Sequence, residues 1–223
     1  MEVIKKAFAD GRRTLTEYES KQLLREYGIP VTREIEVDNR ESLIEAIGEI
    51  GFPLVLKGCG SSLSHKTERN LVYVDIRSKK EAAKAFEAIM ATVKNEGGTV
   101  LVQEMVKGRK ELVAGLSRDA QFGPCVMFGL GGIFTEVLGD VAFRVAPLEK
   151  KDALAMMQEI RGRKILEGVR GSPAADLDQL SKILISLGTI GLEQPTILEI
   201  DINPVILDGS RPVAVDALVV LGG

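Results

Sequence analysis

The sequence predicts an α+β fold built as two lobes, and three observations support this prediction. The chain has 223 residues, which is enough for one large domain or for two modest lobes that each bury a core. Helical and strand patterns both occur along its whole length. They do not follow the regular strand-helix-strand alternation that is typical of a doubly wound parallel sheet, so two α+β lobes are favoured.

The composition excludes several classes of protein. With 45% hydrophobic and 27% charged residues, the chain is neither disordered nor fibrous. Its net charge is −3 with both signs interspersed, so it lacks the basic field expected of a protein that binds nucleic acid or acidic lipid, and any anion site must be local. Cys59 and Cys125 lack metal or disulfide spacing. The N-terminus has no apolar signal core and no run approaches a membrane span of about 18 residues, so we expect a cytoplasmic protein.

In the first half of the chain, turn and capping residues bound the predicted elements. Thr14 and Glu17 have the spacing of a capping box, and Gly28 and Pro30 stop the pattern, which predicts a helix over 14–27. Ser78 with Glu81 predicts a second capped helix that runs to about Asn95. We further expect a helix over 42–50 and strands over 31–37, 54–57, 71–76 and 99–106.

The second half has a different rhythm, with longer strand patterns. Strands are expected over 111–117, 124–129, 196–207 and 212–221, and helices from Glu149 and over 176–188.

One stretch of the first half carries the residues that suit phosphate chemistry. Leu54 to Leu56 form a short apolar run that predicts a buried strand, and Lys57 ends that run, so its ammonium is presented at a strand end. Residues 58–70 then show no helical or strand period, which is typical of a functional or mobile segment. His65, the sole histidine, lies in this loop. It is either a solvated loop residue of no consequence or a neutral imidazole that meets an anionic phosphate as a nucleophile.

The end of the chain predicts an acidic hairpin. Glu199, Asp201 and Asn203 alternate, so on a strand they point to one face. A four-residue turn at 208–211 would place Asn203 opposite Asp216, with Cβ atoms about 5 Å apart. Carboxylate and amide oxygens, completed by substrate phosphates, are how proteins usually hold Mg²⁺. The alternative is a solvated polar face on an exposed hairpin.

Two weaker signals lie between these regions. Glu104, followed by Met105 and Val106, ends an apolar strand and is either a hinge whose backbone meets a ligand or a simple strand end. The glycines of the run GLGG, residues 129–132, would let backbone N–H groups approach a phosphate. That run matches neither a P-loop nor the dinucleotide fingerprint.

Taken in order, five segments give the chain a family resemblance. They are RRTLTEYESKQLLREYGIPV, PLVLKGCGSSLSHKTE, VLVQEMVKGRKELVAGLSRDAQFGPCVMFGLGGIFTE, RGSPAADLDQL, and LEIDINPVIL with AVDA. Together they resemble ATP-grasp proteins, and more closely the nucleotide-binding β subunit of ADP-forming acetate-CoA ligases, which are acyl-CoA synthetases related to succinyl-CoA synthetase.

The resemblance implies an ATP-grasp fold with the nucleotide cleft between two lobes, one formed by 23–104 and the other by 1–22 and 105–223. It implies that Lys57 holds the ATP phosphates and that His65 relays a phosphoryl group between the nucleotide and a phosphohistidine on a partner. The remaining implied roles are adenine binding by Glu104, Met105 and Val106, ribose binding by Glu111, nucleotide binding by Gly131 and Gly132, and Mg²⁺ binding by Asn203 and Asp216 with Asp201 nearby.

The implied reaction is acyl-CoA plus ADP plus phosphate giving acid, CoA and ATP, reversibly. Because the chain ends at Gly223 without a CoA-binding domain, we expect a hetero-oligomer with an α subunit that binds CoA and carries its own phosphorylated histidine. The chain departs from the family at Asn70 and Leu71, where a Gly-Gly pair is usual, and at Ala120, where proline is common. Two other functions stay open, namely a carboxylate-amine ligase that works through a free acylphosphate and a nucleotide-binding regulatory module without turnover.

Overall fold

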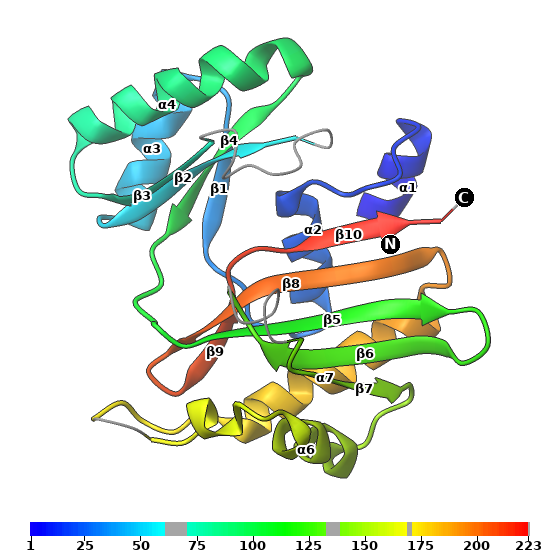
Figure 1. Cartoon of the computed structure of the whole chain (residues 1–223). Coiled ribbons are helices and arrows are strands. Elements are labelled where there is room, and N and C mark those ends of the chain that lie inside the picture. The colour runs from blue at the N-terminus through cyan, green and yellow to red at the C-terminus, as the bar shows by residue number, and fades with distance from the viewer. Residues whose placement is uncertain (61–70, 133–138, 169–170, 223) are drawn as a thin grey trace. The chain divides into compact units, whose positions relative to one another are not determined.

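The computed structural model describes residues 1–60, 71–132, 139–168 and 171–222 (Figure 1). The chain forms two compact units of mixed helix and sheet. The first unit consists of 1–15, 19–31 and 106–223, and the second of 16–18 and 32–105. This division differs from the expected lobes at three places: residues 23–31 pack in the first unit, whereas the short segment 16–18 and Met105 pack in the second.

The second unit is an antiparallel sheet with strand order β1-β4-β2-β3. Helices α3 and α4 cover one face of this sheet (Figure 1). Helix α4 begins where predicted, because the Ser78 side chain accepts a hydrogen bond of 3.3 Å from the Glu81 N–H. The elements are β1 (Glu34–Val37), α3 (Arg40–Ile50), β2 (Leu54–Cys59), β3 (Val72–Ile76), α4 (Lys79–Val93), the 3₁₀ turn Lys94–Glu96 and β4 (Thr99–Glu104).

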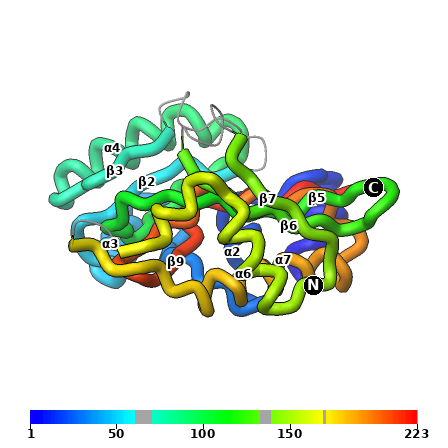
Figure 2. The backbone as a smooth tube through the Cα atoms, turned by 60° about the horizontal axis from the view of Figure 1, so that its bottom comes forward, coloured from blue at the N-terminus to red at the C-terminus, as the bar shows by residue number. Residues whose placement is uncertain are grey.

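The first unit contains a six-stranded antiparallel sheet in which β10-β8-β5-β6-β7 are neighbours and β9 also pairs with β8. Helices α6 and α7 pack together against one face of this sheet (Figure 2). The elements are α1 (Glu2–Ala9), α2 (Glu17–Glu26), β5 (Glu111–Asp119), β6 (Gly123–Leu130), β7 (Val141–Val145), α6 (Lys150–Glu159), the 3₁₀ turn Arg163–Leu166, α7 (Leu177–Glu193), β8 (Ile197–Asp208), β9 (Arg211–Ala214) and β10 (Leu218–Leu221).

Arg118 on β5 joins the sheet to the end of α7. Its guanidinium donates to three backbone carbonyls, with distances of 3.1 Å to Ile197, 2.7 Å to Gly191 and 3.3 Å to Gln194. The last carbonyls of a helix have no partner within the helix, so a cation at this position stabilises the helix terminus.

Three predictions about the elements were wrong. Thr14 does not begin α2 but forms a β-bridge with Val220, and the helix starts at Glu17. Lys57 does not end β2, because the strand continues to Cys59 through pairing with β4. The expected strand 212–221 is two strands, β9 and β10, separated at 215–217. Two elements, α1 and β7, were not predicted. No helix among the described residues has the length and apolar character needed to cross a membrane.

Candidate functional site

The acidic hairpin has the predicted register. Leu207 pairs with Pro212 and Val205 with Ala214, as expected from the turn. Further along β8, Asp201 pairs with Leu218. The register does not shift between the β8–β9 pairs and the β8–β10 pairs as far as Glu199, which pairs with Val220. Asn203 and Asp216 lie between these two groups of pairs. The flanking register therefore places them opposite each other.

The carboxylates on this face interact strongly. Burial, together with the nearby charges of Glu199 and Asp216, raises the pKa of Asp201 from 3.8 to about 6. At neutral pH this carboxylate is ionised, and its charge is then unfavourable because the side chain is buried and its neighbours are negative. A divalent cation would relieve that repulsion.

The donor set fits Mg²⁺ in its chemistry. Asp201, Asn203 and Asp216 offer hard oxygen ligands on one sheet face, and Mg²⁺ is usually bound through one or two carboxylates together with phosphate oxygens and water. Within the part of the chain that the structure describes, no group of three or more histidine, cysteine or acidic side chains is arranged to hold a metal ion by itself. The two carboxylates and the amide are the residues on this face that could hold Mg²⁺.

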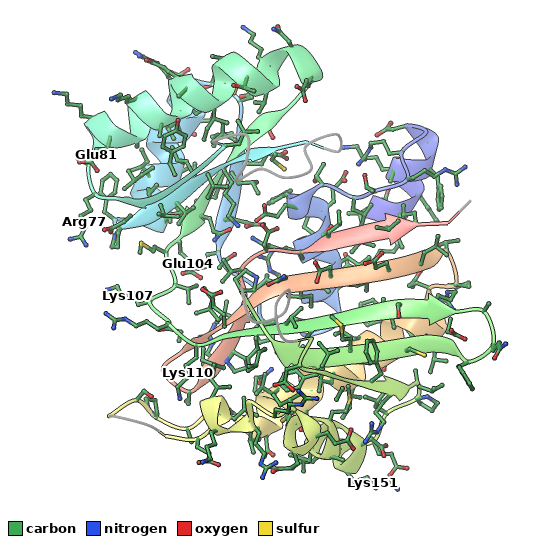
Figure 3. All side chains as sticks on the ribbon, in the orientation of Figure 1. Arg77, Glu81, Glu104, Lys107, Lys110 and Lys151 are labelled. Carbon is green, nitrogen blue, oxygen red and sulfur yellow. The ribbon has the colours of Figure 1, made fainter. Side chains whose placement is uncertain are left out.

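Glu111 and the two glycines of the predicted nucleotide site lie together in the first unit. The Gly131 N–H donates to the Glu111 carbonyl at 2.9 Å, so this N–H serves the fold and is not directed at a phosphate. A Cβ atom at Gly132 would lie 2.7 Å from the Glu111 Oε2 atom. A side chain at this position would therefore require the Glu111 carboxylate to shift. Next to it, Lys110 donates to the Glu167 carbonyl at 2.8 Å, just before β5 begins (Figure 3).

Lys57 lies within the second unit and is buried. Its Nζ atom is 2.7 Å from the Glu17 Oε1 atom, and the side chains are 6% and 0% exposed, respectively. We had expected an ammonium presented at a strand end. The structure instead holds it inside β2, in an ion pair with the first residue of α2.

Glu104 is the last residue of β4 (Figure 3). Its two carboxylate oxygens accept hydrogen bonds from the Arg33 backbone N–H at 2.9 Å and from Arg33 Nε at 2.8 Å. Met105 and Val106 follow, and the boundary between the two units falls between them. The segment is thus the end of β4, and the chain passes from the second unit to the first directly after it. His65 lies outside the described residues.

The sequence analysis missed two residues that contact predicted site residues, namely Glu17, which contacts Lys57, and Arg33, which contacts Glu104. Glu17 was assigned to a capping box, and Arg33 was not singled out. For Arg33 the sequence carries no signal, because its contact with Glu104 joins residues about seventy positions apart.

Comparison with known proteins decides the family. The model of the ATP-grasp domain matches residues 6–221. The chain belongs to the ATP-grasp family. It is 42% identical over 225 residues to the β subunit of acetate-CoA ligase [ADP-forming] I from Pyrococcus furiosus, covering 99% of this chain and 97% of that one.

Two further relatives of this ATP-grasp chain are informative. The acetyl-coenzyme A synthetase 1 of Candidatus Korarchaeum cryptofilum, solved with coenzyme A and Mg-AMPPCP and with its phosphohistidine segment pointing towards the nucleotide-binding site, superposes with a TM-score of 0.88 at 41% identity over 99% of both chains. Acetate-CoA ligase [ADP-forming] I from Archaeoglobus fulgidus is 37% identical over 228 residues, which are 99% of this chain but 33% of that protein.

Proposed function

We propose that this chain is the nucleotide-binding subunit of an ADP-forming acid-CoA ligase. The observation that carries the proposal is the opposed pair Asn203 and Asp216 with Asp201 beside them, found in a chain that shares its whole length with β subunits of such ligases. The overall reaction converts acyl-CoA, ADP and phosphate into the free acid, CoA and ATP.

The step assigned to this chain is phosphoryl transfer between a phosphohistidine and ADP. A β-phosphate oxygen of ADP attacks the phosphorus, a P–O bond forms, the P–N bond breaks, and the imidazole nitrogen recovers its electron pair. We assign the relay to His65 on the family resemblance. Such transfer depends mainly on positioning and on neutralisation of phosphate charge.

The described residues supply those requirements. Lys57 contributes a cation to the phosphates, and Glu111 binds the ribose. Asp201, Asn203 and Asp216 would hold Mg²⁺, which neutralises phosphate charge when it is bound. Glu104, Met105 and Val106, together with Gly131 and Gly132, complete the proposed nucleotide site.

The proposal includes a partner subunit that binds CoA and carries its own phosphorylated histidine. Support comes from the Archaeoglobus relative, in which the segment similar to this chain makes up a third of a longer ligase. The remaining two thirds of that protein lie outside the match to this chain. We therefore assign CoA binding and acid selection to a second chain.

The relay is tested by incubating the full chain with Mg²⁺ and γ-labelled ATP. We expect a protein-bound label that is labile in acid, stable in base and absent from His65→Asn, because phosphohistidine has these properties. ATP binding without any label would favour a regulatory module. If a carboxylic acid is added, formation of free acylphosphate with release of ADP and an unlabelled protein would favour a carboxylate-amine ligase.

The metal site is tested separately by titrating the nucleotide. Asp216→Asn should raise the Kd for ADP at least tenfold in excess Mg²⁺ and leave it within about twofold in EDTA, since the loss of one charged ligand acts only through the metal. Asp208→Asn, on the same hairpin at its exposed turn, is the matched control and should bind as the wild type does. An equal effect of Asp216→Asn with and without Mg²⁺ would remove the metal assignment.

A further inference from the structure

We propose that Glu17 is a positioning residue for Lys57, whose ammonium it orients and keeps charged inside the second unit. This inference rests on the proposed function, in which Lys57 binds the nucleotide phosphates. It adds a residue that the predicted site did not contain.

The contact between Glu17 and Lys57 is direct and buried. The Glu17 Oε1 atom lies 2.7 Å from Lys57 Nζ, and the Glu17 side chain has no exposed surface. Both residues belong to the second unit, because segment 16–18 packs there although the rest of α2 does not. The first residue of the helix is thus placed against the middle of β2.

Packing alone does not account for a lysine at this position. Val55 and Cys59 lie two residues before and after Lys57 on the same face of β2, and both are buried. A buried ion pair can often be replaced by apolar side chains of similar size without loss of stability. The charge is therefore what Lys57 contributes, and Glu17 is the group that makes a buried charge tolerable.

Glu36 lies in the same row of the sheet as Lys57 but is not its strand partner. Across the strands, Lys57 pairs with Leu101 on β4, which pairs with Glu36 on β1. Glu36 itself accepts a hydrogen bond of 2.6 Å from the Thr99 hydroxyl. In the adjacent row, Glu34 on β1 pairs with Gln103, which carries no charge. In the row of Lys57 itself, the partner on β3 is Val72. Leu101 thus separates Glu36 from Lys57 in the sheet.

Loss of the Glu17 charge should therefore act on the protonation of Lys57. An ammonium in an apolar environment loses its proton at lower pH than one beside a carboxylate. A neutral amine does not attract phosphate, so each pH unit above that point should weaken nucleotide binding about tenfold. The pH dependence of ADP affinity consequently distinguishes a positioning role from a structural one.

The experiment measures the Kd of the full chain for ADP in excess Mg²⁺ from pH 6.5 to 9.5. We expect Glu17→Gln to lose affinity with rising pH, so that its Kd relative to wild type increases at least tenfold between pH 7 and 9. Glu17→Asp retains a charge that is set back by one carbon, so its Kd should rise at least threefold at every pH, parallel to wild type. Glu19→Gln, on the same helix as Glu17, breaks an ion pair with Arg12; it is the matched control and should follow wild type.

The possible outcomes test the role of Glu17, the role of Lys57 and the proposed function separately. A Glu17→Gln profile parallel to wild type would overturn the role of Glu17 while leaving the proposed function intact. If Glu17→Gln does not fold, wild-type affinity in Glu17→Asp would overturn it equally. Failure of the wild type to bind ADP would overturn the proposed function instead, and unchanged affinity in Lys57→Met would remove Lys57 from the phosphate site.

Discussion

Asp201→Asn should stabilise the metal-free protein at neutral pH. Burial and the charges of Glu199 and Asp216 oppose ionisation of Asp201 in the folded chain. Asparagine has nearly the same shape and no charge, so the substitution removes this unfavourable interaction. The gain exists only while no cation occupies the face, because a bound Mg²⁺ would turn the same charge into a favourable one.

The size of the effect follows from the pKa. The folded-state pKa of Asp201 is about 6 against an ordinary value of 3.8. Each unit of difference corresponds to about 1.4 kcal/mol, which gives an upper limit of about 3 kcal/mol. Since the side chain is only partly buried, solvent screens the interaction and we expect about 1–2 kcal/mol.

The sign determines the pH window. Below about pH 4 Asp201 is protonated in the folded and the unfolded chain, so wild type and variant should be equally stable. Between about pH 4 and 6 only the folded chain keeps the proton, and the stability of the wild type falls as the pH rises. Above about pH 6 the destabilisation of the wild type is complete, and the free energy of unfolding of the variant should exceed that of the wild type by the full difference.

Urea denaturation in EDTA at pH values from 4 to 8 measures this difference, with Asp208→Asn as control. Asp208 lies on the same strand at its exposed end, so its substitution should give no step near pH 6. An Asp201→Asn variant that is less stable than wild type at pH 7, or a stability difference that does not change with pH, would refute the reasoning. Addition of Mg²⁺ and ADP should stabilise the wild type more than the variant.

Two further predictions concern the framework of the first unit. Arg118→Met should lower the free energy of unfolding by about 2 kcal/mol in urea, because three carbonyls lose a charged donor; a change below about 0.5 kcal/mol would show that water replaces the guanidinium fully. Gly132→Ala should weaken ADP binding, since its Cβ atom would meet the Glu111 carboxylate. Gly209→Ala is the control, because its φ of +64° matches the +63° of Gly132 but its Cβ atom meets nothing closer than 3.9 Å; equal ADP affinities in the two variants would contradict a role for Glu111.

Local signals in the sequence predicted the elements that depend on local interactions. The Ser78 cap of α4 is formed by atoms three residues apart, and the register of the terminal hairpin follows from its turn and from period-2 alternation. Helix α7 begins one residue after its predicted start, because Asp176 is its N-cap and its side chain accepts a hydrogen bond from the Gln179 N–H.

The elements that were missed depend on distant partners. Gly58 and Cys59 carry no strong strand signal, yet they extend β2 because their backbones pair with Val100 and Thr99. The Thr14 backbone joins β10, more than two hundred residues away, and this leaves Glu17 as the first residue of α2. The sequence does not distinguish a Glu17 that forms a capping box with Thr14 from a Glu17 that begins the helix and pairs with Lys57. Only the structure distinguishes them.

The two charged groups of the proposed site are stabilised in opposite ways, which explains why the sequence indicated both of them but not the partner of Lys57. Lys57 has a counter-ion within its own unit, supplied from forty residues away, and such a partner leaves no local pattern. The acidic face of β8 places like charges side by side, which is unfavourable in the metal-free protein and is therefore conspicuous as alternating carboxylates. The lysine is thus charged before nucleotide arrives, whereas the acidic face needs a cation to become favourable. Nucleotide and Mg²⁺ should accordingly bind together, each raising the affinity of the chain for the other.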